Sequence, residues 1–227
     1  MLSHRHRSCG ILCLCEIKET YKLEFVEVKN MHRIYSALIE IVAAAVFIIP
    51  IWCIYNKLCF HSWKRTIIYM VFGFYFTAVL ALVGFPNIAS LKIDFAVNVI
   101  PFLDMVSDFI NACLNILLFV PFGFFLPILW DKFRNIKNIA LMGFIATSLI
   151  EISQIFTFRT SDINDIITNT VGTIIGYFIV HRITDNFTKR IFSNSKMGDF
   201  YIICVSVALI MFFLQPFISS LLWEMVL

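Results

Sequence analysis

Charged residues are scarce in this chain of 227 residues: they make up 15% of it, whereas 60% is hydrophobic. The mean hydropathy is +0.86. A soluble domain of this length could not bury so many apolar side chains, because much of its surface must still face the medium. The formal net charge of +3 is too small and too scattered for a nucleic-acid-binding surface. We therefore predict the lipid bilayer as the main partner and no nucleic-acid partner.

Glycine and proline are also few, with 8 and 6 residues, which excludes collagen-like and low-complexity chains. The seven cysteines show neither a disulfide framework nor the paired spacing of zinc ligands. Sequence motifs of zinc proteases, serine hydrolases, P-loop proteins and dinucleotide-binding domains are absent. We therefore predict no metal and no cofactor. The absence of these motifs leaves open whether the protein is an enzyme.

Long apolar stretches dominate the rest of the chain. A helix needs about 20 apolar residues to cross the hydrocarbon core of a bilayer. Six stretches approach or exceed that length: Ile34–Tyr55, Ile67–Phe85, Phe109–Trp130, Ile139–Phe156, Ile163–Ile183 and Tyr201–Trp223. None alternates with the period of two that a membrane-spanning strand requires. The predicted fold class is all-α, a polytopic membrane helical bundle with six transmembrane helices.

Residues 1–30 form a polar tail without a fold signal, and residues 31–227 form the predicted integral membrane domain. The short apolar run in the tail is too short for the core of a signal peptide. We hypothesise that translation begins at Met31, in which case the tail is not part of the protein. The mass of the mature protein tests this hypothesis.

The distribution of Lys and Arg predicts the orientation, since cytoplasmic loops are enriched in both. One side of the bundle carries ten: Lys57, Lys64, Arg65, Lys132, Arg134, Lys137, Arg182, Lys189, Arg190 and Lys196. The other side carries Arg33, Lys92 and Arg159, with five more if the tail is present. We therefore predict a multi-pass protein of the cytoplasmic membrane with both termini extracytoplasmic.

Polar residues inside the spans follow helical spacing. The stripes consist of Asp104, Asp108, Asn111 and Asn115 on the third span, Thr147, Glu151 and Gln154 on the fourth, and Asp162, Asp165, Asn169, Gly172 and Gly176 on the fifth. At 1.5 Å per residue, Glu40, Asn115, Glu151 and Asn169 all lie about 10 Å below the same surface. We predict that the stripes meet in one polar pocket open to the outer leaflet, with Arg159 and Asp162 at its rim.

Each polar element also has a simpler interpretation. Ser161 or Asp162 is suited to cap the fifth span, and Asp165 lies in its first turn, where the helix dipole favours an acid. Asn115 could serve only to link neighbouring helices, and Gly172 with Gly176 forms a G-x-x-x-G step that favours close helix packing. A functional role is better supported for Glu151, because a carboxyl this deep requires a partner or a proton. Arg159 is the basic residue nearest to it in sequence. Pro121 is expected to kink the third span.

The polar spans resemble the VanZ-like family over residues 98–177. The resemblance rests on N-I-L-L-F-V-P-F-G at 115–123, E-I-S-Q at 151–154, D-I-N-D at 162–165 and N-T-V-G at 169–172, preceded by N-V-I-P-F at 98–102. The family's motif positions on this chain are Asn115, Pro121, Gly123, Glu151, Gln154, Arg159, Asp162, Asp165, Asn169 and Gly172. The resemblance implies a bacterial membrane protein that reduces susceptibility to teicoplanin-type glycopeptide antibiotics.

Three hypotheses follow for the function. In the first, an accessory factor of antibiotic resistance binds a lipoglycopeptide in the polar pocket and lowers its access to its cell-wall target. In the second, an enzyme or transporter acts on a lipid-linked cell-envelope intermediate, with Glu151 and Asp165 handling protons. In the third, the face with Gly172 and Gly176 binds another membrane protein.

Overall fold

The structure of the chain is a computed structural model that describes residues 34–92, 97–98, 100, 109–157, 160–183 and 195–226. Within these ranges, six helices are long and apolar enough to cross a membrane. The fold is the all-α polytopic bundle that the sequence predicts. The tail at 1–30, Met31, Asp104, Asp108 and Arg159 lie outside the described residues.

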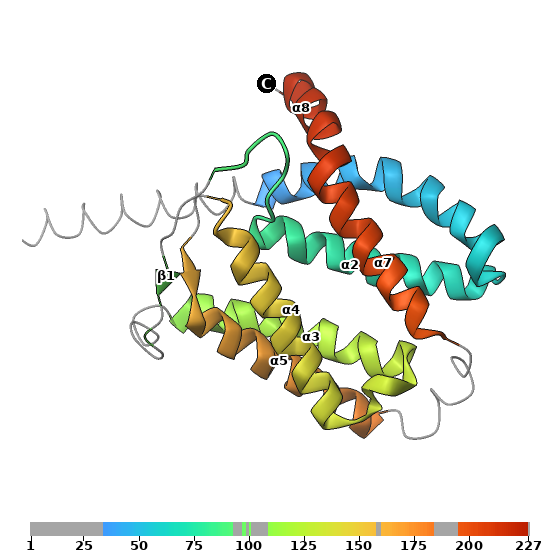
Figure 1. Cartoon of the computed structure of the whole chain (residues 1–227), viewed down its shortest axis with the longest axis vertical. Coiled ribbons are helices and arrows are strands. Elements are labelled where there is room, and N and C mark those ends of the chain that lie inside the picture. The colour runs from blue at the N-terminus through green and yellow to red at the C-terminus, as the bar shows by residue number, and fades with distance from the viewer. Residues whose placement is uncertain are drawn as a thin grey trace, which may run out of the picture.

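The first two spans form an antiparallel helical hairpin. The first span, Ile34–Phe60, ends in a π-helical turn, η1 (Asn56–Phe60), and α2 covers Trp63–Val83. The two helices run in opposite directions along the upper part of the molecule (Figure 1). A Cβ atom on Gly73 of α2 would overlap the ring of Trp52, which is fully buried. The small residue thus allows the indole to pack directly on the α2 backbone.

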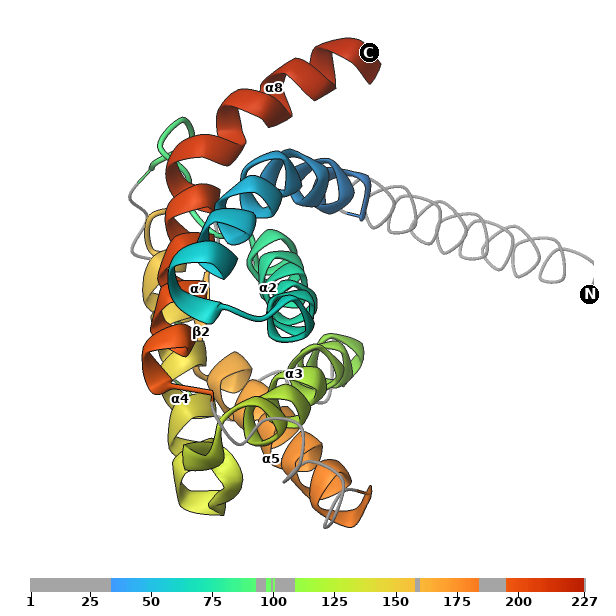
Figure 2. The ribbon, with the colours of Figure 1, turned by 90° about the vertical axis from the view of Figure 1, so that its right-hand side faces the viewer.

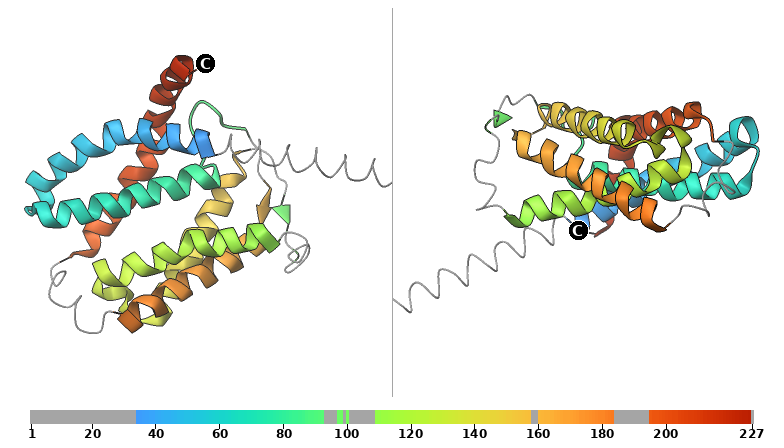
Figure 3. Two further views of the ribbon diagram at one scale, coloured as in Figure 1. Left: turned by 180° about the vertical axis from the view of Figure 1, so that it is seen from behind. Right: turned by 90° about the horizontal axis from the view of Figure 1, so that it is seen from below.

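Three helices form the second group of spans. α3 covers Phe109–Leu129 and includes Pro121 and Pro127, the 3₁₀ turn η2 covers Asp131–Arg134, α4 covers Ile136–Gln154, and α5 covers Ile163–Ile183. α3 and α5 lie side by side and run in the same direction, as the view from behind shows (Figure 3). Among the described elements they share the most extensive contact, and α4 packs on α5.

Glycines explain how closely α3 and α5 approach. A Cβ atom on Gly123 would overlap the main chain of Thr173, and one on Gly172 or Gly176 would overlap the carbonyl groups of Ile116 or Val120. Small residues allow such backbone contact between membrane helices. The face of α5 with Gly172 and Gly176 is therefore covered by α3 of the same chain. This arrangement argues against the hypothesis that the face binds another protein.

The last span consists of α7 (Met197–Leu209), a π-helical turn η3 (Ile210–Leu214) and α8 (Gln215–Val226), with Pro216 as the second residue of α8. α7 packs on α2. In the perpendicular view, α8 extends away from the other helices (Figure 2). The buried rings of Phe72, Trp130 and Phe200 join α2, the end of α3 and α7, with centroids of Trp130 5.3 Å from Phe72 and 5.0 Å from Phe200.

Candidate functional site

The carboxyl group of Glu151 is held at the end of α4. It is buried, with 3% of the residue exposed. Its Oε2 atom accepts hydrogen bonds from the Ser161 hydroxyl at 3.1 Å and from the backbone N–H of Asp162 at 2.9 Å. Both donors belong to β2 (Ser161–Asp162), the short strand before α5. Glu151 therefore fixes the end of α4 to the start of α5.

A second short strand completes this end of the molecule. β1 (Val97–Asn98) pairs in parallel with β2, with Val97 opposite Ser161 and Asn98 opposite Asp162. The side-chain amide of Asn98 donates to Asp162 Oδ2 at 3.2 Å. The other carboxylate oxygen of Asp162 accepts from the backbone N–H of Asn164 at 2.8 Å, the geometry of an N-cap. Asp162 thus caps α5 and also binds the segment that precedes α3.

Two further side-chain hydrogen bonds link α5 to its neighbours. The amide of Asn115 on α3 donates to Asp165 Oδ1 at 2.7 Å. One turn deeper, the amide of Asn169 donates to the hydroxyl of Thr147 on α4 at 2.9 Å. Asn169 is buried, with 3% exposed, and its Oδ1 atom has no hydrogen-bond partner in the described part of the chain. Polar contacts thus extend from the start of α5 into the bundle.

Gln154 lies beside these contacts and binds a different helix. Its side-chain amide donates to the backbone oxygen of Val83, the last residue of α2, at 3.0 Å, and Gln154 is 4% exposed. The backbone N–H of Lys92 donates to the oxygen of Phe156 at 3.1 Å. The chain after α2 is therefore attached to the chain after α4.

The structure brings most of the site residues expected from the sequence to one end of the molecule. We call this set the polar cluster: Asn98, Asn115, Thr147, Glu151, Gln154, Ser161, Asp162, Asp165 and Asn169. Arg159, expected at the rim, is outside the described residues. Glu40 is on the first span, which lies beyond α2 from α3 and α5 in two perpendicular views (Figures 1 and 2).

The spacing of residues in the sequence does not predict the contact between Asn98 and Asp162. A strand of two residues has no periodicity from which it could be recognised. The available signal was the position of Asn98 in the N-V-I-P-F segment, which carried the resemblance but no spatial information.

Within the described residues, no group of three His, Cys, Asp or Glu side chains could hold a metal ion. The cluster contains carboxylate and amide oxygens, which accept hydrogen bonds, and amide N–H groups, which donate them.

Comparison with known proteins identifies one family. A family model described as VanZ/LLP1 matches residues 16–184. The match contains every residue of the polar cluster and extends beyond residues 98–177, over which the motifs carry the resemblance. No curated protein matches the chain, and no solved structure matches it either.

Proposed function

Because the chain belongs to the VanZ/LLP1 family, we propose that it is a membrane accessory factor that lowers susceptibility to teicoplanin-type lipoglycopeptides. In this proposal the polar cluster is an outward-facing pocket that engages the amphiphilic drug at the outer leaflet. The observation that carries the proposal is the burial of Glu151 among hydrogen-bond donors from a neighbouring element, at the end of a span. Ionisable groups within membrane spans are costly and mark functional sites.

The chemistry of the drug class fits this location. An acyl chain inserts into the bilayer and holds the attached polar group at the membrane surface. A protein group near the end of a span could then contact the polar part while the acyl chain remains in lipid. Retention of the drug at the membrane would lower its access to the cell wall.

The proposal predicts a change in antibiotic susceptibility. Expression in a susceptible Gram-positive host is expected to raise the inhibitory concentration of teicoplanin, and that of vancomycin less, since vancomycin has no acyl chain. Glu151→Gln replaces the carboxylate with an amide of similar shape and is expected to abolish most of the increase. Arg159→Ala tests the expected rim residue in the same assay.

The matched control is Glu224→Gln, the same substitution at an exposed position of α8. It is expected to keep the full increase, with membrane levels of all variants compared by immunoblot. If the unmodified chain does not raise the inhibitory concentration of teicoplanin, the proposed phenotype is refuted. A full increase with both Glu151→Gln and Arg159→Ala would refute the role of the polar cluster.

A second function remains, supported by the same burial of Glu151. An enzyme or transporter for a lipid-linked cell-envelope intermediate could use a buried carboxyl and Asp165 to move a proton. It predicts altered lipid-linked precursors in a deletion strain, or pH-dependent uptake into proteoliposomes. Either effect should be lost in Glu151→Gln and kept in Glu224→Gln. Unchanged precursors together with the absence of uptake would exclude this function.

A further inference from the structure

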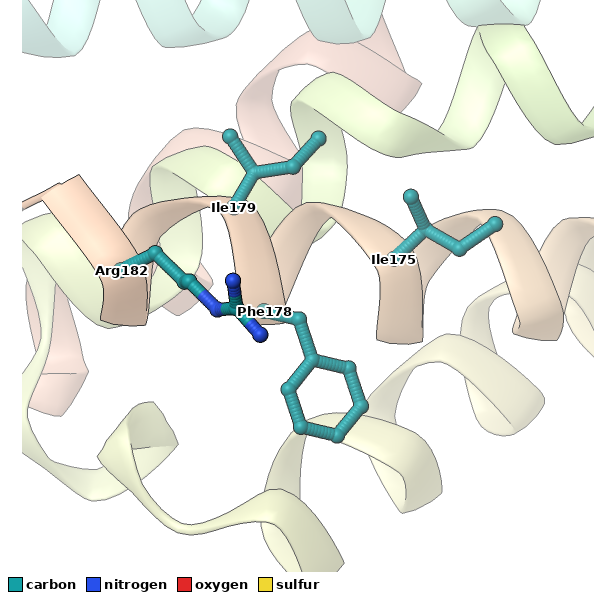
Figure 4. Close-up of a pocket in the computed structure, with 4 residues that line it drawn as sticks. All are labelled: Ile175, Phe178, Ile179 and Arg182. Atoms are coloured by element: carbon teal, nitrogen blue, oxygen red, sulfur yellow. The ribbon is translucent and has the colours of Figure 1, made fainter.

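The outer face of α5 has an apolar hollow near its C-terminal end. It is lined by Ile175, Phe178, Ile179 and Arg182, all from α5, so it is a shallow hollow that is open toward the surroundings of the helix. Their spacing of three, one and three residues places them on one helix face. In Figure 4, the two isoleucines point to one side of the helix and Phe178 to the other, with the Arg182 side chain between Ile179 and Phe178.

Arg182 places a positive charge in this hollow, with its guanidinium group beside Phe178 (Figure 4). Its side chain is exposed, and no ion pair to a described carboxylate is formed. The hydroxyl of Tyr177 donates to the backbone oxygen of Arg134 at 3.0 Å, so the turn η2 and the start of α4 lie beside this part of α5. Lys132 and Lys137 are exposed there. This end of the molecule therefore carries an excess of positive charge.

Hydrophobic walls and a cation at the membrane surface match the two parts of an anionic phospholipid. We propose that the hollow binds such a lipid. An acyl chain lies along Ile175, Phe178 and Ile179, and the phosphate contacts Arg182. Basic sites of this kind beside membrane helices bind anionic head groups. The alternative is an arginine that extends to water without preference for a particular lipid. The two differ in whether Arg182 discriminates between head groups.

The test compares two lipids with identical acyl chains on the full chain purified in mild detergent. Native mass spectrometry measures the retained phosphatidylglycerol, which is anionic, and phosphatidylcholine, which is zwitterionic. The unmodified chain is expected to retain more phosphatidylglycerol. Arg182→Gln removes the proposed contact with the phosphate and is expected to lower that affinity about fivefold, which corresponds to about 1 kcal/mol for one basic residue. The matched control Lys64→Gln removes one exposed charge at the start of α2, on the same predicted side, and should keep the preference.

Two more variants separate charge from shape. Arg182→Lys retains the charge and is expected to retain the preference for phosphatidylglycerol. Phe178→Ala removes part of the hollow and is expected to weaken the binding of both lipids equally. Equal retention of the two lipids by the unmodified chain would overturn the proposal. An Arg182→Gln variant with the same preference for phosphatidylglycerol as Lys64→Gln would also overturn it. Neither outcome bears on the polar cluster, because the two sites lie at opposite ends of α5.

Discussion

Side chains of the polar cluster mostly bind partners on other elements. Asn115 joins α3 to α5, Asn169 joins α5 to α4, and Glu151 joins α4 to β2. A polar group exposed to hydrocarbon has no water to bind, so interhelical hydrogen bonds favour one arrangement of neighbours. These residues thus specify which spans lie together, whatever ligand they bind.

The bond between Asn115 and Asp165 allows a quantitative test of that structural role. A double-mutant cycle with Asn115→Ala and Asp165→Ala should give a coupling of about 0.6 kcal/mol, with about 1.7 kcal/mol as the upper bound for such bonds in membranes. The cycle cancels the separate effect of Asp165 in the first turn of α5. Unfolding of the purified protein in bicelles measures the four free energies.

The control cycle pairs Asn115→Ala with Asn138→Ala. The amide of Asn138 donates to the backbone oxygen of Lys132, at the other end of the molecule. These two substitutions should be additive within about 0.5 kcal/mol. Equal couplings in the two cycles would show that the hydrogen bond to Asp165 does not contribute to stability.

Helical spacing predicted the faces of these residues but not their partners. It placed Asn115, Glu151 and Asn169 at a common depth, and in the structure all three form hydrogen bonds that connect α5 or the strand before it to α3 and α4. It also placed Glu40 at that depth, although the first span lies beyond α2 from α3 and α5 (Figure 2). Residue spacing gives depth along a helix, whereas the lateral order of helices depends on packing.

Element boundaries were predicted to within a few residues. The third and fifth spans begin where expected, at Phe109 and Ile163. α2 begins earlier than its apolar stretch, at Trp63, and the first span continues through η1 to Phe60. Apolar runs report contact with lipid, whereas a helix continues wherever its backbone hydrogen bonds are made. The π-helical turns had no signal in the sequence pattern.

Packing of α3 against α5 should be sensitive to one added methyl group. Gly123→Ala places a Cβ atom against the backbone of Thr173, which cannot move without its helix. Overpacking of this kind costs about 1–3 kcal/mol. We expect a lower midpoint of thermal unfolding in detergent, followed by tryptophan fluorescence.

Gly198→Ala is the control for this substitution. A Cβ atom on Gly198 in α7 meets nothing within 4 Å. Alanine favours a helix over glycine by about 1 kcal/mol, so this variant should be neutral or more stable. If Gly123→Ala and Gly198→Ala unfold at the same temperature, the close contact between α3 and α5 is not as described.

On the scale of the whole molecule, the two proposed sites lie at opposite ends of α5. The polar cluster surrounds its first residues, and the apolar hollow lies near its last ones. If α5 spans the bilayer, the sites face different leaflets. The proposed encounter with an extracellular drug therefore depends on which end faces outward.

Fusions to alkaline phosphatase determine that orientation, because the enzyme is active only after export. The excess of Lys and Arg in the loops at 57–65 and 131–137 predicts that these loops are cytoplasmic. A fusion after Leu227 should therefore be active, and a fusion after Asn135 inactive. Fusions to green fluorescent protein at the same positions should give the opposite pattern and control for expression. If the phosphatase is active after Asn135 and inactive after Leu227, the polar cluster faces the cytoplasm, and direct contact with an extracellular antibiotic is ruled out.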